Sequence, residues 1–177
     1  MPPFDPLPLA ESSNLLAAPN QMAWTLGFHI VFSCLGVALP AIILTANYLG
    51  IKRGDKDAME LARRWSKAMA VTFAVGAVSG TLLSFEFGLL WPEFMDRFGA
   101  AFGVAFAIEG IFFFLEAIFL AVYIYGWKRL RPWQHFWAGV PMVITGIGGA
   151  FSVVPANASV NQPQGLILNA AGGLGGG

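Results

Sequence analysis

Two carboxylates stand inside an otherwise apolar stretch, Ala107–Ala117, which reads AIEGIFFFLEA. They are Glu109 and Glu116, and no other charged residue occurs between Phe98 and Trp127. That stretch exceeds the roughly 20 helical residues needed to cross a bilayer, so the sequence places both carboxylates in lipid. A charge at this depth costs on the order of 3 kcal/mol, so such residues usually pair, bind a ligand or carry protons.

The spacing of Glu109 and Glu116 determines how they lie relative to one another. Seven residues advance a helix by nearly two full turns, so both groups share one face, about 10 Å apart along the axis. Apolar surroundings favour the protonated form of a carboxyl group, which lets such a group hold and release a proton near neutral pH. We therefore expect a line of proton-active groups that faces one neighbouring helix.

A second candidate is His29, the one histidine of the uncharged stretch 23–51. Thr25 and Ser33 lie one helical turn on either side of it and form a small, polar stripe on an otherwise bulky helix. One interpretation is that another helix packs closely here and that His29 makes an interhelical hydrogen bond. The other is that His29 binds a haem or another metal centre, because neutral imidazole is the commonest metal ligand. The residues alone leave both interpretations open.

Three further residues bear on the kind of site. Glu86 lies in the run SFEFGLLWPEF, among aromatic residues of the kind that collect at membrane interfaces, which favours an interfacial carboxylate in water. His135 precedes the last apolar stretch and is interpreted as an interfacial histidine, not a ligand. The single cysteine, Cys34, excludes an internal disulfide and a covalently attached haem, so a haem would be held by axial ligands alone.

The composition identifies the class of protein. Of the 177 residues, 56% are hydrophobic and 11% are charged, and the mean hydropathy is +0.65. These values are far from those of a soluble domain and typical of an integral membrane protein. The net charge is zero, so there is no basic surface for nucleic acid.

We predict an all-α fold, a polytopic transmembrane helical bundle of about four helices. The expected spans are 23–51, 68–88, 98–127 and 136–154, within a transmembrane region at 22–155. An external N-terminal lead-in at 1–21 precedes this region, and a polar, Gly-rich external tail at 156–177 follows it. Small residues in the second and fourth spans suit close helix packing.

The positions of the basic residues predict the orientation of the bundle. Six of the ten Lys and Arg residues lie between positions 50 and 67, and three more lie between 128 and 131. Short loops rich in Lys and Arg stay on the cytoplasmic side of a membrane. Because these two loops alternate with external segments, we expect both termini on the external, periplasmic side.

Four motifs occur in an order and spacing typical of one family. They are Gln21-Met-Ala-x-x-Leu-Gly-Phe-His29, Glu86-Phe-Gly with Trp91 after it, Phe102-Gly-x-x-Phe-Ala-Ile-Glu-Gly-Ile continued through Glu116 to Gly126-Trp, and Gln134-His135. The motifs extend over about residues 15–165, and AIEG followed by FFFLEA is highly specific. On these residues the chain resembles subunit I of the cytochrome bd quinol oxidases.

The resemblance implies a quinol:oxygen oxidoreductase of the respiratory chain, a multi-pass protein of the bacterial cytoplasmic (inner) membrane. Such an enzyme oxidises quinol and reduces dioxygen to water with protons from the cytoplasm. It implies non-covalently bound haem b and haem d, or a variant set of b-type haems. By resemblance, His29 is the axial ligand of the iron of a high-spin haem, and Glu109 is a ligand or near-ligand there. Glu116 serves proton delivery or charge compensation, and Glu86 lies near the haem pair.

The implied partners are oxidase subunit II, a small accessory subunit, quinol, dioxygen and membrane lipid. Members of the family are much longer, and their further helices carry the low-spin haem ligands and the quinol-binding loop. We therefore expect neither site in these 177 residues, which correspond to a truncated subunit or a fragment.

Two alternative functions remain. One is a non-redox helical membrane protein, a proton-coupled carrier or assembly partner that uses Glu109 and Glu116 for protons alone. The other is a nonfunctional truncated remnant of the oxidase.

Overall fold

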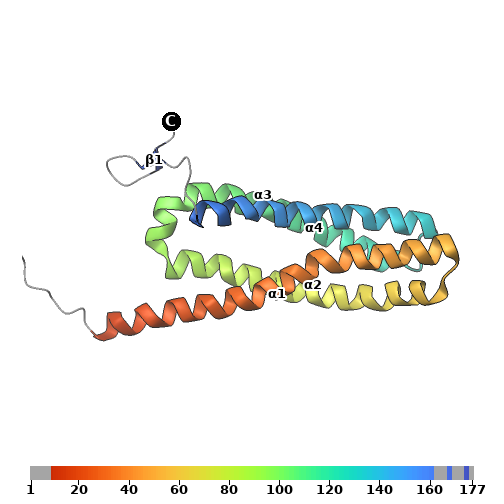
Figure 1. The fold of residues 1–177 in the computed structure, drawn as a ribbon, viewed down its shortest axis with the longest axis horizontal. Coiled ribbons are helices and arrows are strands. Elements are labelled where there is room, and N and C mark those ends of the chain that lie inside the picture. Colours follow the sequence, from red (N-terminus) through yellow and green to blue (C-terminus); the bar gives the residue numbers. More distant parts are fainter. Residues whose placement is uncertain (1–8, 162–166, 169–173, 176–177) are drawn as a thin grey trace, which may run out of the picture.

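Four long helices and one short strand pair make up the described part of the chain (Figure 1). The structure, a computed structural model, describes residues 9–161, 167–168 and 174–175. The elements are α1 (Leu9–Arg53), α2 (Lys56–Leu90), α3 (Pro92–Gly126), α4 (Pro132–Asn161), β1 (Ile167–Leu168) and β2 (Leu174–Gly175). The predicted all-α bundle of four helices is confirmed, and the antiparallel pair β1–β2 is an addition to it.

The helices are longer than the apolar spans predicted from the sequence. α1 begins at Leu9, so the expected lead-in at 1–21 is helical from that residue on, and residues 1–8 lie outside the described residues. α4 continues to Asn161, into the expected tail at 156–177. Hydropathy marks only the apolar part of a helix, whereas good helix formers such as Ala, Leu and Glu extend it beyond that part. Those three residue types account for most of the stretch 9–18.

Short turns join the helices into an up-and-down bundle. Between α1 and α2, Gly54 takes the left-handed conformation with φ 68°, which suits a residue without a Cβ. The next residue, Asp55, caps α2, because its Oδ1 accepts from the backbone N–H groups of Asp57 and Ala58 at 3.0 Å each. Pro92 begins α3 directly after α2, where its missing N–H costs no helical hydrogen bond.

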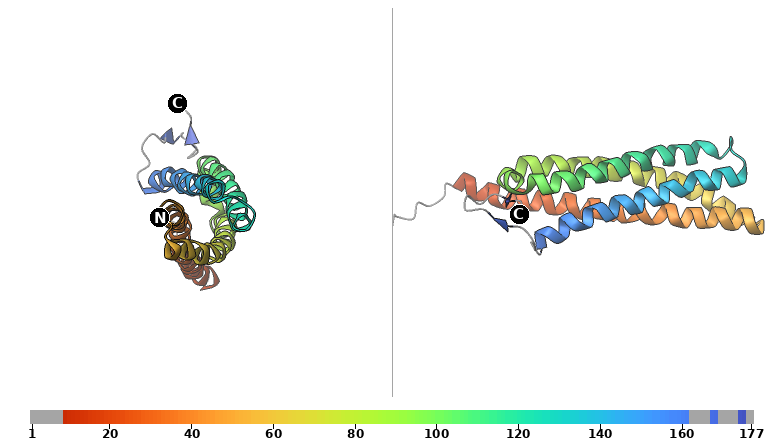
Figure 2. Two further views of the ribbon diagram at one scale, coloured as in Figure 1. Left: turned by 90° about the vertical axis from the view of Figure 1, so that its right-hand side faces the viewer. Right: turned by 90° about the horizontal axis from the view of Figure 1, so that it is seen from above.

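Both Lys- and Arg-rich turns lie at the same end of the bundle, at the right in Figure 1. We call it the basic end; it comprises residues 52–56 and 127–131. The other end, which we call the opposite end, contains the α2–α3 turn and the last residues of α4. α1 packs along α2 and α3 packs along α4, whereas α1 meets α4 over a shorter stretch. Viewed along the bundle, the helices follow an arc (Figure 2, left).

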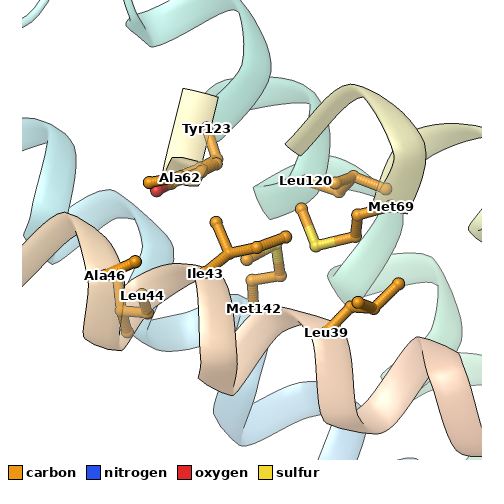
Figure 3. Close-up of a cluster of buried hydrophobic side chains, with 9 residues drawn as sticks. All are labelled: Leu39, Ile43, Leu44, Ala46, Ala62, Met69, Leu120, Tyr123 and Met142. Atoms are coloured by element: carbon orange, nitrogen blue, oxygen red, sulfur yellow. The ribbon is translucent and has the colours of Figure 1, made fainter. Parts of the chain in front are cut away.

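The main apolar core lies in the half of the bundle nearest the basic end (Figure 3). Its nine buried residues come from all four helices and are Leu39, Ile43, Leu44, Ala46, Ala62, Met69, Leu120, Tyr123 and Met142. A Cβ added at Gly139 of α4 would lie 2.8 Å from Leu44 Cδ1 and 2.9 Å from the Tyr123 ring. The absence of that Cβ therefore lets α1, α3 and α4 pack closely in this half.

All four helices contain a stretch that is long and apolar enough to cross a membrane. These stretches are Leu16–Arg53, Lys56–Leu90, Phe98–Gly126 and Pro132–Ala158. Many large apolar side chains point outward, and Trp24 is 82% exposed. Such surfaces suit contact with lipid tails, and the helices satisfy their own backbone hydrogen bonds, as a bilayer requires.

Candidate functional site

A polar seam joins α1 to α2 in the half of the bundle toward the opposite end. Gln21, Thr25, His29 and Ser33 recur at every fourth position of α1 and so lie on one face. A Cβ added at Gly80 of α2 would lie 2.9 Å from Cε1 of His29. The imidazole therefore lies against α2 at a residue without a side chain, and the predicted close approach at a small, polar stripe is confirmed.

The imidazole of His29 makes hydrogen bonds through both of its nitrogens. Nδ1 lies 3.0 Å from Oγ of Ser79 on α2, and Nε2 lies 2.9 Å from Oγ of Ser33 on α1. The side chain is half-buried. The interhelical hydrogen bond that the sequence suggested is therefore present, while the role of His29 as a metal ligand stays a prediction.

Glu86 is buried in the same seam. Its side chain is 8% exposed, and Oε1 accepts hydrogen bonds from Gln21 Nε2 at 3.1 Å and Thr25 Oγ1 at 2.8 Å. Oε2 is also buried and has no hydrogen-bond partner among the described residues. The interpretation of Glu86 as an interfacial carboxylate in water is therefore wrong. The reason is that α1 extends past this level and covers the carboxylate with its own polar side chains.

The α3 carboxylates lie on the other side of the bundle, toward α4. A Cβ added at Gly146 would lie 3.1 Å from Oε1 of Glu116, so this carboxylate rests against a bare part of the α4 backbone. One turn earlier on the same face, the ring of Phe112 rests against Gly148 in the same way, with a Cβ there 2.6 Å from Cε1. Both carboxylates, Glu109 and Glu116, are half-buried. For Glu116, the expected orientation toward one neighbouring helix is confirmed.

The structure thus brings together some of the predicted site residues and not others. His29 and Glu86 share the α1–α2 seam, because Thr25 contacts Glu86 one helical turn from His29. In the part of the chain that the structure describes, no hydrogen bond or ion pair joins Glu109 or Glu116 to them. The α3 carboxylates therefore form a separate group on the other hairpin.

His135 is a buried core residue. It is 3% exposed, and its ring stacks against that of Tyr123 with centroids 4.2 Å apart and lies tilted against that of Trp127 with centroids 4.3 Å apart. Its Nε2 donates to the backbone oxygen of Tyr123 at 2.8 Å. Nδ1 lies 3.4 Å from Nδ2 of Asn47. The ring therefore packs inside the protein near the start of α4, and the position of His135 at a membrane interface stays a prediction.

Three residues of the site were not singled out by the sequence: Ser79, which contacts His29, and the glycines that admit His29 and Glu116. Ser79 and Gly80 belong to the run Gly76-Ala-Val-Ser-Gly80, which predicted close packing but not the residue packed against it. Gly146 is one of several glycines in α4, and nothing in their pattern distinguished it.

A bundle of four membrane-type helices with an imidazole and a buried carboxylate in one seam belongs to the class of polytopic membrane proteins with an internal polar site. Within this class, a sequence profile described as Cytochrome bd terminal oxidase subunit I matches residues 18–174. The chain belongs to this family.

Relatives and a solved structure agree with the family. The chain is 31% identical over 157 residues to the cytochrome bd ubiquinol oxidase subunit 1 of Bacillus subtilis (strain 168), covering 88% of this chain and 34% of that protein. It is 27% identical over 146 residues to the cytochrome bd-II ubiquinol oxidase subunit 1 of Escherichia coli (strain K12), covering 82% and 28%. The bd oxidase structure from Geobacillus thermodenitrificans matches with a TM-score of 0.86 and 35% identity, over 92% of this chain and 38% of that chain. The chain spans about a third of the length of the curated relatives it matches.

Proposed function

We propose that this chain forms a four-helix part of subunit I of a bd-type terminal oxidase. The complete complex would oxidise quinol and reduce dioxygen to water, with protons taken up from the cytoplasm. Support comes from membership of the family and from the relatives, whose names describe them as ubiquinol oxidase subunits. The single observation that carries the proposal is the α1–α2 seam, which contains a half-buried imidazole and a buried carboxylate whose Oε2 has no partner among the described residues.

In this proposal His29 would hold the iron of a high-spin haem, of the b or d type. The residues present fit that group in three respects. The ring is half-buried and lies against a glycine, its Nε2 lies 2.9 Å from the rotatable hydroxyl of Ser33, and Oε2 of Glu86 has no partner among the described residues. Such a haem, when bound, would supply an iron able to bind and reduce dioxygen.

The carboxylates in this proposal hold and pass protons. Each electron added to a site in an apolar medium must be matched by a proton, because uncompensated charge is costly there. Glu116 lies ten residues before the end of α3 at the basic end. Glu109 lies seven residues farther from that end, about two helical turns. We assign proton delivery to Glu116. We assign Glu109 and Glu86 to positions beside the haem.

The orientation and partners follow from the same proposal. The basic end faces the cytoplasm of a bacterium and both termini lie on the periplasmic side of its inner membrane. Subunit II and a small accessory subunit are partners in the complex. The low-spin haem ligands and the quinol site come from outside these 177 residues. The large exposed apolar surface is suited to contact with those parts and with lipid.

The test is the haem absorption spectrum of the assembled complex with His29→Ala. Loss of a high-spin haem band, with subunit II still co-purifying, is the expected result, because alanine has no ligand atom. Cys34→Ala is the control, since Cys34 is an exposed side chain on the same helix. An unchanged spectrum with His29→Ala would refute the ligand role. A wild-type complex without any haem would favour the non-redox carrier or assembly partner.

A further inference from the structure

Ser79 contacts His29 and its own helix at the same time. Its Oγ lies 3.0 Å from His29 Nδ1, and 3.0 Å from each of the backbone oxygens of Val75 and Gly76. A carbonyl oxygen only accepts hydrogen bonds, so the single hydroxyl proton of Ser79 is directed at its own helix. The hydroxyl oxygen then has lone pairs left to accept a bond from the imidazole. This arrangement favours the tautomer of the neutral His29 ring that carries its proton on Nδ1.

The other ring nitrogen is therefore the one that can bind a metal. A neutral imidazole has one N–H group, so Nε2 carries a free lone pair. Ser33 lies 2.9 Å from it and donates its hydroxyl proton to that lone pair. Ser33 makes no other hydrogen bond within residues 9–161, so its hydroxyl is free to rotate away from Nε2.

We propose that Ser79 is a positioning residue that fixes the tautomer of His29 and leaves Nε2 as the atom that binds the haem iron. This inference rests on the proposed role of His29 as a haem ligand. Metal-binding histidines commonly donate their second ring N–H to a fixed acceptor, which orients the ring and makes the ligand nitrogen more basic. Ser79 suits this role because it is 4% exposed and its hydroxyl is held by the backbone of its own helix.

Gly80 completes the arrangement. The imidazole Cε1 lies where a side chain of residue 80 would begin, 2.9 Å from the position of a Cβ. The ring can therefore approach α2 closely enough for Nδ1 to reach Ser79.

The reverse arrangement exchanges the roles of the two serines. Nε2 would then donate to Ser33, and Nδ1, which faces the buried Ser79, would be the ligand atom.

The experiment compares Ser79→Ala with Ser33→Ala in the assembled complex. Ser84→Ala is the control, because Ser84 lies on the same helix as Ser79, is exposed and bonds only to the backbone oxygen of Gly80. The readouts are haem retention during purification, the midpoint potential of the high-spin haem and the iron–histidine stretching frequency in resonance Raman spectra. None of these requires turnover.

Ser79→Ala removes the hydroxyl acceptor beside Nδ1 and leaves the ring its backbone hydrogen bond to Gly76, so Nε2 becomes a weaker electron donor. We expect a higher midpoint potential, a lower iron–histidine stretching frequency and about 10-fold weaker haem retention. Ser33→Ala should match the control in potential and stretching frequency, since the Ser33 hydroxyl leaves Nε2 when iron binds.

Other outcomes of the same experiment would decide against the inference or call for a second variant. If Ser33→Ala shifts the potential and Ser79→Ala does not, the reverse tautomer holds and the inference is overturned. If both match the control while His29→Ala loses the haem band, the inference fails and the proposed function stands. If Ser79→Ala does not assemble, Ser79→Thr, which retains the hydroxyl, should restore the wild-type potential. A potential of the assembled Ser79→Thr complex that differs from the wild-type value would overturn the inference.

Discussion

At the basic end all four helices contribute to one apolar core, whereas toward the opposite end the α1–α2 and α3–α4 hairpins diverge (Figure 1). The polar residues of the described chain follow this division. Asn47 and His135 lie at the core, while His29 and Glu86 lie in the seam of one hairpin beyond it. The packed half holds the helices in position, and the divergent half contains the polar seam between α1 and α2.

The two histidines differ in the same way as the two halves of the bundle. His135 packs against two aromatic rings, and its Nε2 is fixed by a backbone oxygen, which cannot move away. His29 is bonded on both nitrogens by serine hydroxyls, of which Ser33 is free to rotate. A histidine whose bonds are to fixed groups stabilises the fold, and one with an exchangeable partner is suited to bind a ligand.

The largest expected effect concerns the sidedness of the two ends. Reporter fusions after Lys56 and after Lys128 should report the cytoplasm, and a fusion after Met95 should report the external side, because basic loops remain inside. The readout is all-or-none for each fusion. The reverse pattern would place the packed core on the external side and reject the direction assigned to proton uptake.

The next effect is on turnover and concerns the α3 carboxylates. Glu116→Gln keeps the shape of the side chain and removes its ability to carry a proton, so oxygen reduction by the assembled complex should fall about 100-fold. The haem spectrum should stay unchanged. Glu93→Gln, at an exposed glutamate near the start of the same helix, is the control. Normal turnover with Glu116→Gln would remove this residue from the proton path.

A smaller effect on stability compares two threonines of α1. Thr25→Val removes a hydrogen bond to the buried Glu86 and should lower the free energy of unfolding by about 1–2 kcal/mol. Thr45 lies in the basic half, is exposed and bonds only to the backbone oxygen of Ala41, so Thr45→Val should change stability little. Thermal unfolding in detergent measures both. Equal effects would mean that the bond to Glu86 contributes nothing to holding the seam.

The sequence predicted most of the fold because a bilayer leaves few alternatives to apolar helices. The four apolar stretches identified the helices, and the small, polar stripe around His29 identified the α1 face that packs closely. It predicted the helix ends less well, because polar residues such as those at 9–21 and 56–67 can continue a helix beyond its apolar part.

The site was predicted in part for an equally physical reason. The types of His29, Glu109 and Glu116 are unusual at membrane depth and are visible in the sequence alone. The burial of Glu86 is not, because it depends on Gln21 and Thr25, more than sixty residues away on another helix. Ser79 was missed because serines in membrane helices commonly bond only to their own backbone.

The central claim is that His29 supplies the haem ligand from the α1–α2 seam, and chemical rescue tests it most directly. His29→Gly removes the imidazole and leaves a space beside Gly80, which itself has no side chain. The measurement is the haem absorption spectrum of the assembled His29→Gly complex with and without added imidazole. We expect the high-spin haem band to be lost and then restored by imidazole but not by an equal concentration of pyrrole, which has no basic nitrogen. A band that persists in His29→Gly without imidazole would contradict the claim.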